Sequence, residues 1–403
     1  MDLKHRLGTL RRQTGVSPQP AAPAVAERVA RYRPGAQSGR SQALDPAALA
    51  ERLGGALVDD GVILIEQRLP LQICHGGITL SRLLGDNDGL AEARGRDPQG
   101  LLFLDTETSG LAGGTGTVVF LLGLARIEQQ HLVVHQYHLT RFGAEGAMLR
   151  RASAWLRAAE CMVSYNGKCF DVPLLTTRFR LCGVHSPLER LAHLDLLHPT
   201  RRAFNRRWGD CRLATAERRL LGFERQDDLP GSEAPEAWFA WVRRQDPARL
   251  PGIARHNRWD VLSLAALIPA LAHAYTEPGA VDADVAAVAR GLRARGEGLR
   301  ALQLLVEHRS MLDSDGLLEL AALYRRANRW SEAQAIWEPL AAAGHVTAIE
   351  RLAKYHEHVA GDPGAALAYA ERLPRGPVHD GRRLRLQQRL AMRERAARGT
   401  PLP

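Results

Sequence analysis

Three β-type segments follow one another between residues 101 and 139. This succession restricts the possible fold classes more than any other feature of the sequence. Residues 101–104 and 117–126 are apolar runs, and residues 131–139 alternate between apolar and polar side chains. Turn-type residues separate the three segments, which predicts an antiparallel meander. Helix and strand patterns then alternate: helix 145–160, strand 161–165, helix 171–182, strand 191–197, and helices to Tyr275. This order predicts an α/β domain with a mixed sheet flanked by helices.

The segments outside this block have different compositions. Residues 1–44 are rich in Pro, Ala, Gly, Ser and Arg without periodicity, and we expect a disordered basic tail. Residues 45–99 suggest a small α+β appendage with no assigned task. The sheet domain is expected over 100–276. Residues 277–403 contain two imperfect helical hairpins resembling tetratricopeptide repeats, expected either to bind a protein partner or to form a plain helical cap.

Charge and cysteine content narrow the class of protein. The formal net charge is +10, of which residues 1–41 carry +6 and residues 372–400 carry +7, leaving −3 for residues 42–371. Five cysteines without a C-x-x-C pair argue against a disulfide framework and a cysteine zinc site. We expect no secretory signal at the N-terminus, because no apolar segment follows its charges. The longest apolar stretch, 261–275, is too short to cross a membrane. We therefore expect a cytoplasmic protein without a membrane partner.

Acidic residues occur at three places where β-type or helical segments begin or end. Asp105 and Glu107 follow the apolar run 101–104, and alternation along a strand puts them on one face. Asp171 stands where a helix begins, and His256 precedes Asp260 by about one helical turn. Each has a plain structural alternative: a solvated turn, an N-cap aspartate, and a surface ion pair.

These motifs resemble a known family when they are taken in order. Asp-x-Glu-Thr-x-Gly-Leu, Asn-x-x-x-Phe-Asp-x-Pro-Leu-Leu and His-x-x-x-Asp are similar to the DEDD (DnaQ-like) exonucleases, and most of all to the YprB-like group of predicted exonucleases. The resemblance covers residues 60–275 and implies a ribonuclease H-like fold. It also implies that four acids hold two Mg²⁺ or Mn²⁺ ions, and that a fifth residue is the general base. On this resemblance, the acids are Asp105, Glu107, Asp171 and Asp260, and the base is His256.

The resemblance implies a metal-dependent 3′→5′ exonuclease that releases nucleoside 5′-monophosphates from single-stranded DNA or RNA. Carboxylates suit this chemistry because hard divalent cations prefer oxygen ligands. One departure concerns the base, because family members have His-x4-Asp or Tyr-x3-Asp, and this chain has His with the tyrosine spacing. Tyr165 is a conceivable substitute for His256. Two alternatives remain open, namely a catalytically silent nucleic-acid-binding scaffold and a ribonuclease H-type endonuclease.

Further residues are candidates for contacts with nucleic acid. Arginines alternate with aromatic rings over residues 201–212, a pattern in which guanidinium groups hold phosphates and rings stack on bases. Asp195 is either an accessory acid or a residue that orients a neighbour. Phe170 is expected to serve packing and not to contact the substrate. The candidates for substrate binding are Leu111, Asn166, Lys168, Arg201, Arg202, Arg206, Arg207 and Trp208.

Overall fold

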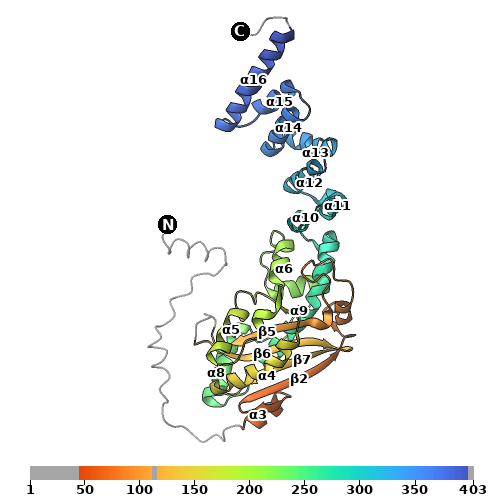
Figure 1. Ribbon diagram of the computed structural model, residues 1–403. Coiled ribbons are helices and arrows are strands. Elements are labelled where there is room, and N and C mark those ends of the chain that lie inside the picture. The colour runs from red at the N-terminus through yellow and green to blue at the C-terminus, as the bar shows by residue number, and fades with distance from the viewer. Residues whose placement is uncertain (1–44, 111–115, 398–403) are drawn as a thin grey trace. The chain divides into compact units, whose positions relative to one another are not determined.

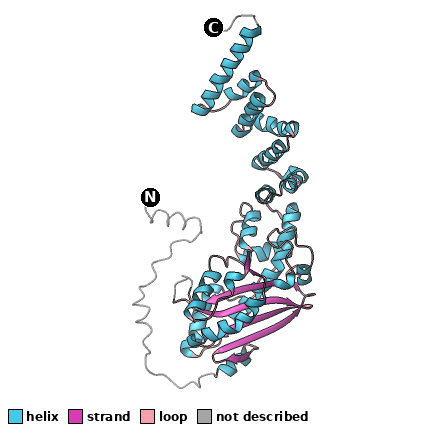
Figure 2. Ribbon diagram, in the orientation of Figure 1, coloured by secondary structure: helices cyan, strands magenta, loops and turns pink. Residues whose placement is uncertain are grey.

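The computed structural model describes residues 45–110 and 116–397 of the 403-residue chain. Its centre is a seven-stranded mixed sheet with the order β1-β2-β7-β6-β5-β8-β9 (Figure 2). A second, two-stranded sheet pairs β3 with β4. The strands are β1 (Ala56–Asp59), β2 (Val62–Pro70), β3 (Cys74–His75), β4 (Ile78–Thr79), β5 (Leu101–Thr108), β6 (Val119–Glu128), β7 (His131–Leu139), β8 (Cys161–Ser164) and β9 (Ala192–Asp195).

The predicted meander is confirmed as β5, β6 and β7. These strands pair antiparallel, whereas β8 joins β5 in parallel and β9 joins β8 in parallel. The carboxyl ends of β5, β8 and β9 therefore meet at one edge of the sheet. In open sheets with parallel strands, polar side chains at such an edge can converge on a ligand.

The segment expected to be an appendage belongs in part to the main sheet. All nine residues of β2 pair antiparallel with β7, and β1 pairs with β2. The prediction that residues 45–99 stand apart from the sheet is therefore wrong for these two strands. The pairing joins residues more than sixty positions apart, as in Pro70 with His131, and local patterns do not report such contacts.

Helices cover both faces of the sheet. On β7, His135 stacks on Trp155 of α4, while the adjacent Gln136 donates to the Ala254 carbonyl of α9. Neighbouring strand residues point to opposite faces, so α4 and α9 lie on opposite sides. The helices of this part are α3 (Pro46–Arg52), α4 (Glu145–Ala158), α5 (Asp171–Leu181), α6 (Leu197–Phe204), α7 (Leu213–Ala216), the π-helix η5 (Glu217–Leu221), α8 (Ala234–Arg244) and α9 (Leu250–Thr276). Short 3-10 helices are η1 (Leu80–Leu84), η2 (Pro98–Gly100), η3 (Phe142–Ala144), η4 (Leu188–Arg190), η6 (Gly231–Glu233), η7 (Pro278–Val281) and η8 (Arg309–Met311).

Helix α9 is the central helix of this part. Its second half, which contains the apolar stretch 261–275, is almost entirely buried. A continuous apolar core links the sheet and α9 to the first helices of the C-terminal region. Among the described helices, none is long and apolar enough to cross a membrane.

Only helices follow residue 277 in the described chain (Figure 1). Consecutive helices pack in pairs, α10 with α11, α12 with α13 and α14 with α15, and α16 packs on α15. Helix α10 also contacts α6. The helices are α10 (Val285–Ala294), α11 (Gly298–Glu307), α12 (Ser314–Arg326), α13 (Trp330–Ala342), α14 (Val346–His358), α15 (Pro363–Glu371) and α16 (Pro377–Ala397).

Candidate functional site

Asp105 stands near the carboxyl end of β5 and is held by a polar relay from α9. Asp105 lies opposite Gly123 of β6, and Gly123 lies opposite Gln136 of β7. Asn257 Nδ2 donates to Asp105 Oδ2 at 2.8 Å. Gln136 Nε2 donates in turn to Asn257 Oδ1 at 2.8 Å. A Cβ at position 123 would lie 2.2 Å from Asn257 Oδ1, so a glycine leaves room for the relay.

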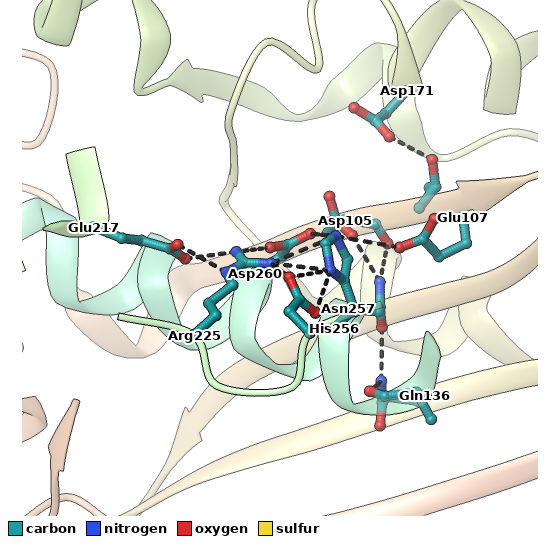
Figure 3. A network of polar contacts seen from close by, with 12 residues as sticks. Asp105, Glu107, Gln136, Asp171, Glu217, Arg225, His256, Asn257 and Asp260 are labelled. Carbon is teal, nitrogen blue, oxygen red and sulfur yellow. Dashed lines mark hydrogen bonds and ion pairs between the residues drawn. The ribbon is translucent and has the colours of Figure 1, made fainter. Parts of the chain in front are cut away.

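Glu107, His256 and Asp260 form a compact group beside Asp105 (Figure 3). One ligand atom from each of the three lies within 4.8 Å of the other two. His256 Nε2 is 3.5 Å from Asp260 Oδ2 and 4.0 Å from Glu107 Oε1. The helical spacing of His256 and Asp260 thus brings both side chains to the end of β5.

Asp171 is the first residue of α5 and adds a fourth carboxylate. Its side chain does not cap the helix, but accepts a hydrogen bond from Thr106 Oγ1 of β5 (Figure 3). Burial raises the pKa of Asp171 to about 6, although the Thr106 bond acts in the opposite direction. The N-cap alternative for Asp171 is therefore wrong.

The acids influence one another strongly. Burial raises the pKa of Asp105 and of Glu107 well above the ordinary range, and the charges of Asp260 and Asp171 add to the effect. Carboxylates this close favour the ionised form only when cations neutralise them. The donor set is oxygen-rich, partly free of protein partners and buried, and these properties fit hard divalent cations.

Sequence reasoning missed a buried arginine at the site. Arg225, in the loop after η5, donates to Asp260 Oδ1, and to Glu217 through Nε at 2.8 Å and Nη2 at 2.6 Å. Burial opposes its charge, but Asp260 and Glu217 together raise the pKa of Arg225. Glu217 also accepts a hydrogen bond from Ser263 of α9. No motif marks Arg225, because it lies in an irregular loop and its partner Asp260 is 35 residues further along the chain.

Asp228 was missed for the same reason. It lies three residues after Arg225, and its oxygens are 2.8 and 2.9 Å from His256 Nδ1. Figure 3 shows that Asp260 lies between the guanidinium of Arg225 and the ring of His256. The loop 222–230 therefore completes one side of the site.

Asp195 orients the turn that leads to Asp171. Its carboxylate accepts backbone N–H groups from Asn166 at 2.7 Å, Lys168 at 3.0 Å and Leu197 at 3.1 Å. Asn166 adopts a positive φ of 66° in this turn. Of the two roles considered for Asp195, the contacts favour that of orienting a neighbour.

The hydroxyl of Tyr165 is hydrogen-bonded away from the four acids. This hydroxyl donates to the carbonyl of Cys211 at 2.7 Å, and burial raises its pKa. Both features oppose the role of a general base that was considered for Tyr165. His256 is the residue whose ring contacts the acids.

The basic segment 201–212 differs from its predicted form. Trp208 is 6% exposed and stacks on Phe204 with ring centroids 4.1 Å apart, so its ring is not available to a base. This prediction is wrong because the indole completes the apolar core. Arg201 is exposed. Three other arginines of the segment form ion pairs with acids, and these pairs weaken their attraction for a phosphate. The ion pairs are Arg202–Glu92, Arg206–Asp284, Arg206–Asp313, Arg206–Asp315 and Arg207–Asp282.

Lys168, Cys169 and Phe170 are exposed on the turn before Asp171. Phe170 is 61% exposed, which opposes the expectation that it serves packing. The backbone N–H of Lys168 donates to Asp195, while its side chain is exposed. Leu111 lies outside the described residues.

The fold and the acidic site agree with comparisons to known proteins. Residues 102–272 match the RNase H superfamily, and this part of the chain is therefore an RNase H-like domain. The chain is 35% identical over 337 residues to the uncharacterized protein YprB of Bacillus subtilis (strain 168), a match that covers 78% of this chain and 80% of that protein. The chain belongs to the YprB family.

Proposed function

We propose that this protein is a metal-dependent 3′→5′ exonuclease that acts on single-stranded nucleic acid and releases nucleoside 5′-monophosphates. The observation that carries the proposal is the convergence of four carboxylates from β5, α5 and α9, with the pKa raised at three of them. The RNase H-like fold supports a nuclease. The direction of degradation rests on the resemblance to the DEDD exonucleases.

The four acids are the proposed ligands for two Mg²⁺ or Mn²⁺ ions. Bound divalent cations would activate a water molecule and stabilise the oxygen that leaves the phosphodiester. Asp105 is held for this task by Asn257, and Asp171 by Thr106. Arg225 occupies one oxygen of Asp260 and leaves Oδ2 facing His256.

His256 is the proposed general base. Its Nε2 faces Asp260 and Glu107 at 3.5 and 4.0 Å, so a water molecule held by the acids would be within its reach. Proton transfer to a positioned side chain typically contributes about 10²–10⁴-fold to a rate. The tyrosine-like spacing is compatible with this role, because one helical turn places His256 directly beside Asp260.

The proposed path of the substrate strand passes the turn before Asp171. Lys168 supplies a positive charge for a phosphate, and the exposed ring of Phe170 supplies a surface for a base. Arg201 is a further candidate for phosphate contact. The helical region after residue 277 remains a proposed site for a protein partner.

The test compares linear and circular single-stranded DNA and RNA, with the linear strands labelled at the 5′ end. With Mg²⁺ or Mn²⁺, we expect stepwise shortening of the linear strands from the 3′ end, while circular strands stay intact. EDTA should stop the reaction. Cleavage of circles would instead indicate a ribonuclease H-type endonuclease, and no degradation of any substrate would favour the silent scaffold.

A further inference from the structure

The loop between η5 and η6, together with the first residue of η6, lies against the ring of His256. Asp228 contacts Nδ1 through both oxygens, at 2.8 and 2.9 Å. Gly231, the first residue of η6, lies near Nε2, and a Cβ there would be 3.4 Å from Nε2, an ordinary van der Waals distance. The chain therefore approaches both ring nitrogens, and Asp228 is the residue that contacts Nδ1 through its side chain.

The contact with Asp228 determines which ring nitrogen carries the proton. An ionised carboxylate only accepts hydrogen bonds, so Nδ1 must donate to Asp228. Nε2 of a neutral ring then presents a lone pair toward Asp260 and Glu107, the side on which a water molecule would lose its proton. In general, the hydrogen bond made by one ring nitrogen of a histidine sets the protonation of the other nitrogen.

The opposite tautomer fits the surroundings poorly. Arg225 Nη1 lies 3.1 Å from His256 Nδ1 and could donate to a lone pair there. That lone pair would then also face two carboxylate oxygens of Asp228 at less than 3 Å. Nitrogen and oxygens would all be acceptors, with no proton between them to form a hydrogen bond. Arg225 Nη1 also lies 3.4 Å from Asp228 Oδ2.

We propose that Asp228 is a positioning residue, which fixes the ring and the tautomer of His256 so that Nε2 faces the acids. The inference rests on the proposed function, because it assigns a purpose to the orientation of the proposed base. It also accounts for the unusual spacing: His256 is oriented by a loop about thirty residues earlier in the chain and not by its helix alone.

The experiment compares three variants of the full-length protein. Asp228→Ala removes the acceptor, and Asp228→Asn retains an oxygen that can accept from Nδ1. Asp227→Asn is the matched control, because Asp227 is the exposed neighbour in the same loop and asparagine tolerates its positive φ of 50°. We expect Asp228→Ala to lower kcat about 10–100-fold with KM changed less than about twofold, Asp228→Asn to recover part of the loss, and Asp227→Asn to behave as the wild type.

A second readout does not depend on catalysis. Long-range ¹H–¹⁵N spectra of histidine-labelled, metal-free protein at pH 8 report which nitrogen carries the proton, and the signal that His256→Gln removes identifies this ring. We expect the proton on Nδ1 in the wild type and its redistribution in Asp228→Ala.

Either of two results would overturn the proposal: a wild-type ring with its proton on Nε2 alone, or an Asp228→Ala protein with the kcat of the wild type. If the wild type degrades no substrate, the proposed function fails, while the wild-type spectrum still tests the orientation by Asp228. That spectrum also decides the question if Asp228→Ala does not fold.

Discussion

Gly123 is the position at which a single methyl group has the clearest consequence. In Gly123→Ala, the new Cβ would lie 2.2 Å from Asn257 Oδ1, and the buried amide would have to leave Asp105. We expect the free energy of unfolding to fall by about 1–3 kcal/mol, as for other overpacked cores. Urea denaturation measures this loss.

The control for this substitution is Gly298→Ala, where nothing lies within 4 Å of the added Cβ. This variant should be as stable as the wild type or slightly more stable. Equal stability of Gly123→Ala and the wild type would contradict the close packing of Asn257 over the sheet.

His138 makes the stability depend on pH. It is fully buried beside Phe120, and burial lowers its pKa from 6.5 to about 4. Above pH 6.5 the residue is neutral in both states, but between pH 6.5 and 4 only the unfolded chain takes up the proton. The free energy of unfolding should therefore fall by up to about 3 kcal/mol over this window.

His138→Phe should remove this contribution and flatten the dependence on pH, measured by denaturation at pH 7.5 and 4.5. His185→Gln, at an exposed position, serves as the control. If His138→Phe lost as much stability in acid as the wild type, the burial of a neutral His138 would be refuted.

The elements of the sheet were predictable, because their patterns are local. The meander, the strand at 161–164 and the helices on either side of it follow from alternation and apolar runs, and their observed ends lie within a few residues of the predicted ones. The place of β2 beside β7 was not predictable, because it depends on a pairing between distant segments.

In the candidate site, too, residues with local sequence signals could be predicted and residues with long-range contacts could not. The acids could be found because each stands at the end of a strand or on a helix with a recognisable neighbour. Arg225 and Asp228 belong to an irregular loop whose contacts with α9 span about thirty residues of sequence. Trp208 was misjudged because its arginine neighbours indicate nucleic acid, whereas its actual partner is Phe204, one helical turn earlier.

The loop and η5 are joined by the buried ion pair of Arg225 and Glu217. Arg225→Met would leave the buried Glu217 carboxylate without its cation, and we expect a loss of about 3–5 kcal/mol in the free energy of unfolding. Adding Glu217→Gln should recover part of this loss, since Glu217 then no longer needs a cation, whereas Asp260 still lacks its arginine. Urea denaturation of the two variants measures the difference, and equal losses would contradict the pairing.

At the scale of the whole molecule, the charge is divided between a near-neutral body and two basic ends. Residues 1–41 carry +6, and Arg389 and Arg395 of α16 are exposed. Deleting residues 1–41 and replacing both arginines by Gln should weaken binding of single-stranded nucleic acid at low salt. The slope of log K against log salt should fall by about 0.7 for each phosphate that the variant no longer neutralises.

Turnover at saturating substrate should stay nearly unchanged in this variant, because the acids of β5, α5 and α9 are untouched. Binding titrations at several salt concentrations make the measurement, and the affinities of wild type and variant should converge as salt rises. Equal affinity at low salt would show that the basic ends do not capture nucleic acid.

The central claim is that the buried carboxylates form a metal-dependent nuclease site, and Asp105→Asn tests it most directly. The amide keeps the shape of the side chain and can remain next to Asn257, so the fold should be retained in circular dichroism. We predict that wild-type protein degrades end-labelled single-stranded nucleic acid with Mg²⁺ or Mn²⁺, and that folded Asp105→Asn does not. Undiminished metal-dependent degradation by this variant would contradict the account.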